Sequence, residues 1–178
     1  MARTVPVAAT VAPGQFITGA LWNAQVAALN SFALAVPVFS GYATTVQSIA
    51  GANVMVALNL DTEALDADGG HSTVTNTSRY TPTVPGLYFA IGSVGWPANN
   101  TGDRRLQIGL NGGGVVGSGT SYDPTTGVTN GMQTMTTVSC NGTTDYIEVM
   151  AAQASGGNLS TIAGGIFSPS LRVFWISR

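Results

Sequence analysis

The stretch Tyr-Thr-Pro-Thr-Val-Pro-Gly-Leu-Tyr-Phe-Ala-Ile-Gly-Ser-Val, residues 80–94, carries the strongest fold signal in the chain. Pro82, Pro85 and Gly86 predict a turn, because proline fixes φ and lacks an N–H, while glycine adopts dihedral angles that other residues avoid. Residues 87–94 are small, apolar or aromatic and carry no charge on either face. Such a segment is typical of a central strand that a second sheet covers on one side and a neighbour covers on the other.

Strand-like segments continue on both sides of this stretch. Val54, Val56, Leu58 and Leu60 alternate with other residues, and Asn111-Gly112 offers the type I′ turn of a tight hairpin. The expected strands cover residues 36–39, 42–49, 52–60, 87–94, 104–110, 131–139, 146–152 and 171–176. Residues 61–78 are polar and are expected to form a loop. Short strands with frequent turns predict an all-β sandwich or jelly roll.

The N-terminal residues follow a different pattern. Residues 1–17 contain prolines and small apolar residues and predict an extended arm. Thr18 is placed to cap one short helix from about Gly19 to Phe32, whose apolar face holds Trp22, Val26, Leu29 and Ala33. A helix of about four turns is marginal alone, so it needs to dock on the β domain, on sister subunits or on a larger body. The chain therefore divides into an arm and helix, residues 1–37, and a β domain, residues 38–178.

The low content of charged residues favours an oligomer or a larger assembly over a monomer. A chain of 178 residues is long enough for one ordinary core. Charged residues make up 8%, against about 25% in an average soluble domain, and there is no lysine. Because like-charge repulsion between copies is small, we expect this protein to oligomerise or to pack into a larger assembly.

Several partners are not expected. The net charge is -2 and only Arg104 and Arg105 are adjacent arginines, so the sequence predicts no nucleic-acid binding. The apolar run at residues 32–39 is less than half of the roughly 18 residues that span a membrane, and no secretory signal is expected. Cys140 is the single cysteine, and we expect a buried thiol without an intrachain disulfide.

Four segments together resemble the globular C1q/TNF-like domain. They are residues 80–88 with their Pro-Gly-Leu-Tyr, Leu110-Asn111-Gly112, the Asp-Tyr-Ile-Glu-Val of residues 145–149, and the Phe-Ser-Pro-Ser-Leu of residues 167–171. The resemblance covers roughly residues 38–178 and implies a ten-stranded jelly roll that forms a tight homotrimer. It also implies that Tyr88 and Ile147 lie near the subunit contact. The chain lacks the collagen stem and the cysteine pair of the animal family.

The N-terminal segment resembles the openings of small structural proteins of tailed phages that infect actinobacteria. The resemblance rests on Thr4-Val-Pro-Val-Ala and on residues 14–23, Gly-Gln-Phe-Ile-Thr-Gly-Ala-Leu-Trp-Asn. It implies a virion protein whose partners are the major capsid protein or tail proteins. Under this hypothesis Phe16, Trp22, Val26 and Leu29 anchor the chain to the particle.

Candidate catalytic and metal-binding groups are few, and we expect no enzyme, no cofactor and no metal. His71 is expected to be a solvated loop histidine and Cys140 a structural thiol, and Gly117-Ser-Gly119 has no following helix. The acidic residues from Asp61 to Asp68 offer oxygen ligands to calcium but lack the spacing of a calcium loop. Trp96, before Pro97 and a polar loop, is the expected exposed contact for a partner or glycan.

Three hypotheses follow from the sequence. The first is a trimeric capsid decoration protein, with the arm and helix bound to the shell. The second is a tail-fibre or tail-tip knob, in which loops 61–78 and 96–103 bind a host surface glycan. The third is a secreted C1q-like binding module.

Overall fold

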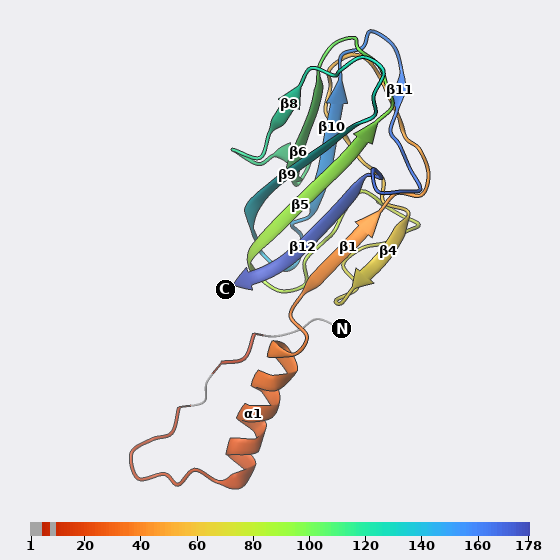
Figure 1. Ribbon diagram of the computed structural model, residues 1–178. Helices are drawn as coiled ribbons and strands as arrows, with labels where there is room; N and C mark the ends of the chain where they lie inside the picture. The colour runs from red at the N-terminus through yellow and green to blue at the C-terminus, as the bar shows by residue number, and fades with distance from the viewer. Residues whose placement is uncertain (1–4, 8–9) are drawn as a thin grey trace.

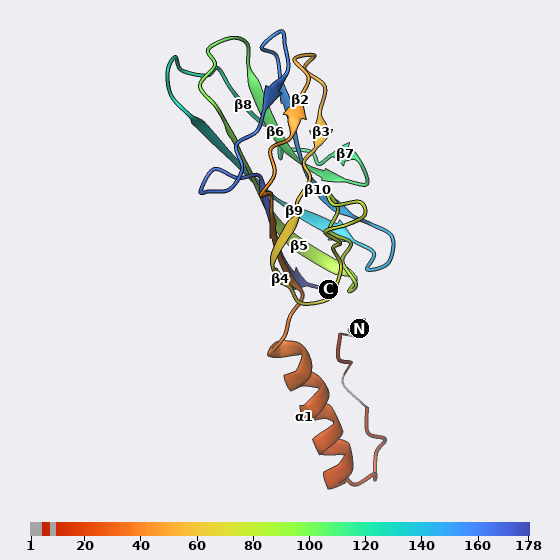
Figure 2. The same ribbon diagram turned by 90° about the vertical axis from the view of Figure 1, so that its right-hand side faces the viewer.

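The computed structural model describes residues 5–7 and 10–178. A helix stands at one end of a two-layered β-sandwich, beside the chain's C-terminal end (Figures 1 and 2). The elements are α1 (Gly19–Ala33), β1 (Val38–Tyr42), β2 (Ser48–Ile49), β3 (Val56–Ala57), β4 (Thr62–Asp66), β5 (Gly86–Trp96), β6 (Arg104–Leu110), β7 (Gly113–Gly114), β8 (Thr120–Tyr122), β9 (Asn130–Cys140), β10 (Ile147–Gln153), β11 (Leu159–Ser160) and β12 (Ser170–Ser177).

Two antiparallel sheets make the sandwich. The front sheet, which faces the viewer in Figure 1, has the strand order β4-β1-β12-β5-β9. The back sheet has the order β3-β10-β6-β7, with β8 also paired to β6, and β2 pairs with β11 in a short ribbon. Apart from the β6–β7 hairpin and the nearby β8, the paired strands are far apart in sequence, so the two sheets depend mainly on long-range pairing.

Strand β5 is an inner strand of the front sheet, as its sequence predicts. Its eleven residues pair with β9 from Gly86 opposite Cys140 to Trp96 opposite Asn130, and its other edge pairs with β12. Alternate side chains point into the sandwich and are buried, whereas Phe89 and Ile91 point outwards and remain partly exposed. The second sheet therefore covers one face of β5, and the other face is open in this chain.

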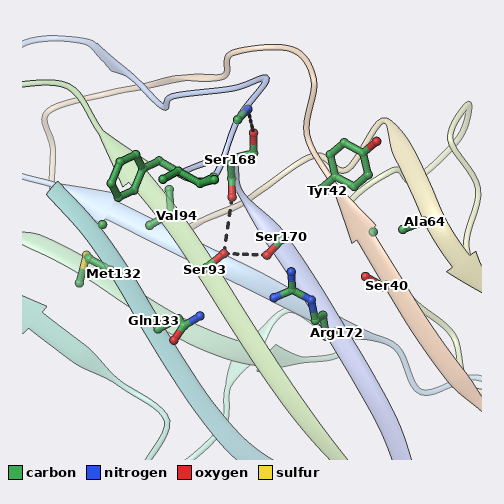
Figure 3. A pocket seen from close by; sticks show the side chains of 15 residues that line it. Ser40, Tyr42, Ala64, Ser93, Val94, Met132, Gln133, Ser168, Ser170 and Arg172 are labelled. Atoms are coloured by element: carbon green, nitrogen blue, oxygen red, sulfur yellow. Dashed lines mark hydrogen bonds between the residues drawn. The ribbon is translucent and has the colours of Figure 1, made fainter. Parts of the chain in front are cut away.

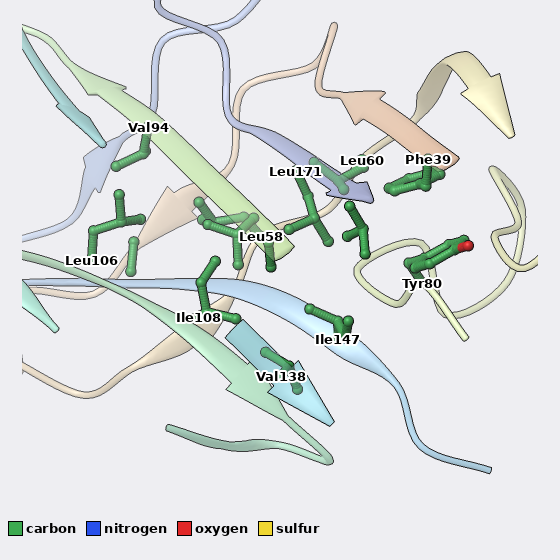
Figure 4. Packing of buried hydrophobic residues seen from close by; sticks show 14 of the residues in the cluster. Phe39, Leu58, Leu60, Tyr80, Val94, Leu106, Ile108, Val138, Ile147 and Leu171 are labelled. Atoms are coloured by element: carbon green, nitrogen blue, oxygen red, sulfur yellow. The ribbon is translucent and has the colours of Figure 1, made fainter. Parts of the chain in front are cut away.

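The hydrophobic core lies between the two sheets (Figure 4). Phe39, the second residue of β1, stacks on Tyr80 with ring centroids 4.6 Å apart. The other labelled core side chains come from both sheets and the segments between them: Leu58, Leu60, Val94, Leu106, Ile108, Val138, Ile147 and Leu171. Cys140 is a free, buried thiol as predicted, and burial raises its pKa to about 12.

Helix α1 agrees with its predicted bounds to within one residue. The Thr18 hydroxyl accepts a hydrogen bond from the Leu21 N–H at 3.2 Å and caps the first turn. Phe32, in the last turn, is buried, and its ring meets that of Trp175 edge-on with the ring centroids 5.0 Å apart. The other described helix side chains are exposed or only partly covered. The helix is therefore fixed to the β domain at one end and exposed along its length.

The predicted hairpin turn at Asn111-Gly112 is confirmed. Both residues have positive φ, 54° and 80°, as a type I′ turn requires, and Leu110 pairs with Gly113 across it. The predicted strand at residues 52–60 is wrong except at β3, because Asn53 takes a φ of 58° and turns the chain. The strand expected at residues 42–49 is likewise interrupted between β1 and β2.

The interruption between β1 and β2 is fixed by Asp61. Its carboxylate accepts the Thr44 N–H at 2.6 Å and the Thr45 N–H at 2.9 Å. Partial burial opposes ionisation, but these bonds and the hydroxyl groups of Thr44 and Thr62 prevail and lower the pKa of Asp61 to about 2. The ionised carboxylate thus stabilises the fold.

The polar segment 61–78 is not simply a loop, which corrects the prediction. It begins with β4, which pairs with β1 at the edge of the front sheet. The side chain of His71 is fully buried rather than solvated. Its Nδ1 lies 2.7 Å from Glu63 Oε1, its Nε2 lies 3.0 Å from the Thr77 carbonyl oxygen, and its ring packs on Phe39. These contacts hold the loop against the core.

Replacing Asp61 tests its contribution. Because its folded pKa lies below the ordinary value of 3.8, the stabilisation is present above pH 4 and is lost as the pH falls towards 2. We expect Asp61→Asn to lower the free energy of unfolding by about 1–2 kcal/mol at pH 7, after allowing for solvent screening. The difference from the wild type should shrink towards zero near pH 2 in urea titrations. A difference that does not change with pH would contradict this account.

Candidate functional site

The outward side chains of the front sheet change from apolar to polar along the strands. In antiparallel sheets, residues directly opposite one another point to the same face, so the register defines rows across the sheet. The first row that spans all four strands at the helix end is Val38, Phe174, Phe89 and Thr137. The next row is Ser40, Arg172, Ile91 and Met135, and the third is Tyr42, Ser170, Ser93 and Gln133. We call this surface the open face.

The apolar end of the open face is exposed to solvent in the single chain. Phe174 is 40% exposed and Met135 is 54% exposed, and Phe89 and Ile91 are partly exposed between them. Ile176 extends the apolar surface towards the helix. A contiguous apolar surface on a sheet typically marks a contact with another protein.

A pocket of about 580 Å³ lies at the polar end of the open face (Figure 3). Its floor is formed by side chains of β1, β12, β5 and β9, and the loop at residues 165–168 forms a wall. The Ser93 hydroxyl lies 2.7 Å from the Ser170 hydroxyl. Arg172 and Gln133 lie beside these serines (Figure 3). The pocket thus presents hydroxyl, amide and guanidinium groups.

The wall of the pocket is firmly held. The Gly165 N–H donates to the Ser168 hydroxyl and the Ser168 N–H donates to the Gly165 carbonyl, both at 3.0 Å. Phe167 packs on Gly95 and Gly131, where an added Cβ would approach its atoms to 2.5 Å and 2.9 Å. These glycines therefore let the aromatic ring lie against the sheet.

Two residues predicted to be near a subunit contact lie in the core instead. Tyr88 and Ile147 are fully buried within the chain, and the Tyr88 hydroxyl donates to the Val84 carbonyl at 2.6 Å. Neither offers surface to another subunit. The outward residue of β5 at this level is Phe89, the direct neighbour of Tyr88, and sequence reasoning missed it.

Trp96 is also fully buried, so the prediction of an exposed glycan contact there is wrong. Strand β5 extends through Trp96, and the buried Arg104 guanidinium lies 5.8 Å from its ring. Arg104 also donates to the carbonyl oxygens of Asn99, Thr101, Gly102 and Asp103. Burial lowers the pKa of Arg104. The loop after Trp96 is thereby closed around a buried cation rather than open to a partner.

The four residues predicted as the virion anchor are exposed. Phe16 is 91% exposed, Trp22 is 61% exposed, Leu29 is 60% exposed and Val26 is 36% exposed. Trp22, Val26 and Leu29 lie on one side of α1, following the helical repeat. Their exposure leaves the surface available, and their role as an anchor stays a prediction.

The acidic residues of segment 61–68 serve structural contacts. Asp66 accepts the N–H groups of Gly69 and His71, both at 2.9 Å, while Glu63 contacts the His71 ring. Within residues 5–7 and 10–178, histidine, cysteine and acidic side chains do not gather in threes as a metal site requires. In the same residues, no helix is long and apolar enough to cross a membrane.

Comparison with known proteins identifies the fold. No family model and no curated protein matches the sequence. The globular domain of the zebrafish complement 1qA protein superposes with a TM-score of 0.56 at 14% identity, covering 80% of this chain and 98% of that one. Murine APRIL superposes with a TM-score of 0.57 at 11% identity, covering 78% and 98%. Eiger TNF from S. frugiperda gives 0.51 at 10% identity, covering 80% and 92%. The fold is therefore the predicted C1q/TNF-like jelly roll.

The hydrogen bonds from Arg104 to the carbonyl groups of residues 99–103, which we call the Arg104 clamp, predict an effect on stability. Arg104→Met removes a buried cation and leaves carbonyl groups of residues 99–103 without their donor. We expect the free energy of unfolding to fall by about 2–4 kcal/mol. Arg105→Gln is the matched control, because its neighbouring guanidinium is 45% exposed and pairs with Asp103 at the surface. It should cost less than about 1 kcal/mol. Equal losses in urea titrations of the two variants would contradict the clamp.

Proposed function

We propose that this chain is a non-enzymatic structural module that forms a homotrimer through the apolar end of its open face. The observation that carries the proposal is the outward pair of aromatic rings, Phe89 and Phe174, on neighbouring inner strands. A strand interior with uncharged outward residues is expected to be covered, and none of the residues that the structure describes covers these two rings fully. The resemblance to C1q/TNF-like domains favours three copies around a closed rotation axis.

Charge distribution supports self-association. Arg172 is the one charged side chain in the three rows of the open face that we describe, and no acidic residue belongs to them. Residues 4–60 contain no charged side chain at all. Copies of the chain can therefore approach with little repulsion and with little cost for removing charges from water.

Introducing a charge on the open face tests the trimer. Phe174→Asp is expected to convert a trimer into monomers, because three desolvated carboxylates would meet within one apolar contact. Sedimentation equilibrium measures the mass, and circular dichroism checks that the variant is folded. Val116→Asp is the control, since Val116 is 98% exposed and lies outside the front sheet. A monomeric wild type, or a folded Phe174→Asp trimer, would contradict the proposal.

We further propose that the trimer is a virion protein, most simply a capsid decoration protein, anchored by its arm and α1. The exposed side chains of Trp22 and Leu29 support the proposal, because they lie on a helix that contacts the β domain mainly through Phe32. Residues 4–23 resemble the openings of phage structural proteins, and this resemblance suggests the major capsid protein as the partner. With the helix bound to the shell, the β domain projects outwards.

Two substitutions on the exposed side of the helix test the anchor. Trp22→Ser with Leu29→Ser should reduce binding to purified particles at least tenfold, because two apolar side chains worth about 1.5–3 kcal/mol each are lost. The control is Ala24→Ser with Ala27→Ser on the opposite side of α1. Both proteins should remain trimers. Undiminished binding of the first variant would refute the anchor.

Immunogold labelling of particles locates the protein. Gold spread over the heads is the expected result for capsid decoration. Gold confined to the tail end would replace this assignment with a tail-fibre or tail-tip role. Particles without gold would contradict both virion roles while leaving the trimer measurement unaffected.

A further inference from the structure

We propose that the pocket at the polar end of the open face binds a sugar that carries a carboxylate group. This site adjoins the apolar residues assigned to self-association, because its Ser40 and Arg172 share a row with Ile91 and Met135. It is separate from the helix assigned to anchoring. The sequence offered no sign of it, because its residues come from β1, β5, β9, β12 and the loop before β12. Each of them is a common polar or small residue when taken alone.

The charge in the pocket selects an anion. Among the described residues that line it, Arg172 is the one charged side chain, and no carboxylate is present. Its guanidinium makes no hydrogen bond or ion pair within the described part of the chain and lies beside the serine pair (Figure 3). Arginine presents a planar fork of N–H groups that matches a carboxylate in two parallel hydrogen bonds.

The remaining polar groups suit the hydroxyls of a sugar. Ser40, Ser93, Ser170 and Gln133 can each donate and accept hydrogen bonds, and they occupy neighbouring positions across four strands. Gln133 is exposed and makes no hydrogen bond within the described residues. A ring with several hydroxyl groups meets this mixture of donors and acceptors better than a simple carboxylate does.

The walls and the volume are consistent with one sugar ring. Tyr42 lines the side formed by β1, and Phe167 and the almost fully exposed Ile166 line the opposite loop. Aromatic faces pack on the apolar face of a sugar ring. The volume of about 580 Å³ falls within the usual range of about 300–1,000 Å³ for small-ligand pockets. Because the loop is closed by its own hydrogen bonds and Phe167 rests on two glycines, the walls exist before a ligand arrives.

Saturation-transfer difference NMR on the full chain tests the proposal with methyl glucuronide. Methyl glucoside is the matched probe that lacks only the carboxylate, and acetate supplies the carboxylate without the ring. We expect saturation transfer to methyl glucuronide and at least tenfold weaker binding of either other probe. Arg172→Gln should weaken methyl glucuronide binding at least tenfold, and Gln133→Ala should weaken it to a smaller degree. Arg105→Gln should leave it unchanged.

The outcomes separate this site from the proposed assembly when sedimentation is measured on the same samples. Absence of methyl glucuronide binding to wild-type trimers would overturn the pocket and leave the trimer standing. Equal affinity for methyl glucuronide and methyl glucoside would show that Arg172 does not bind the carboxylate. Undiminished binding of methyl glucuronide by Arg172→Gln would show the same. If Arg172→Gln dissociated the trimer and no probe bound the wild type, Arg172 would be a subunit contact and the ligand proposal would be wrong.

Discussion

The pairing of β5 with β12 on one edge and with β9 on the other is the constraint on which the rest of the structure depends. It fixes which side chains enter the core and which form the open face. A slip of one residue would exchange Tyr88 with Phe89 and would move the buried set to the surface. The Val84 carbonyl, which accepts the Tyr88 hydroxyl, helps to hold this register from within the core. The apolar rows and the pocket are both consequences of the same register.

Many of the few charged side chains of this protein hold loops in place through hydrogen bonds. Asp61 fixes the bend after β1, Asp66 and Glu63 hold the segment around His71, and Arg104 closes the loop after β5. Glu148 is buried beside Ser78 and Arg79. Because these groups are committed to local contacts, the open face and the helix remain almost free of charge. A surface of this kind gains more from association than a highly charged one would.

The sequence predicts the elements well where the signal is local. The Thr18 cap, the helical repeat of α1 and the positive φ values of Asn111-Gly112 are local features, and the structure agrees with each. Strand β4 is missed because its Thr-Glu-Ala-Leu-Asp pattern does not alternate, and only pairing with the distant β1 defines it. His71 is misread for a related reason, since its burial depends on Glu63 and Thr77 being brought around it.

The errors at the candidate site have a different cause. Residues 87–94 are uncharged on both faces, so alternation cannot tell inward from outward positions. The family resemblance implies Tyr88 near the subunit contact, whereas the outward residue at this level is Phe89. Trp96 is expected to be exposed because it precedes Pro97 and a polar loop, yet it is the buried last residue of β5, and Arg104 closes the loop that follows. The pocket gave no local signal, because its rows exist only after four strands are aligned.

The helix and the apolar end of the open face are both exposed apolar surfaces with few charged side chains. A helix of fifteen residues without a charged side chain gains little from its own sequence, and the β domain covers it mainly at Phe32. The helix extends from the end of the sandwich where β1 begins and β12 ends (Figures 1 and 2), and the register places the apolar Val38 and Phe174 at that end of the open face. Neither surface is covered along its length by residues 5–7 and 10–178. Neighbouring copies covering the face would bring their helices together at one end, where several weak apolar contacts would act as one multivalent attachment. The polar pocket, at the far end of the strands, lies on the side away from that attachment.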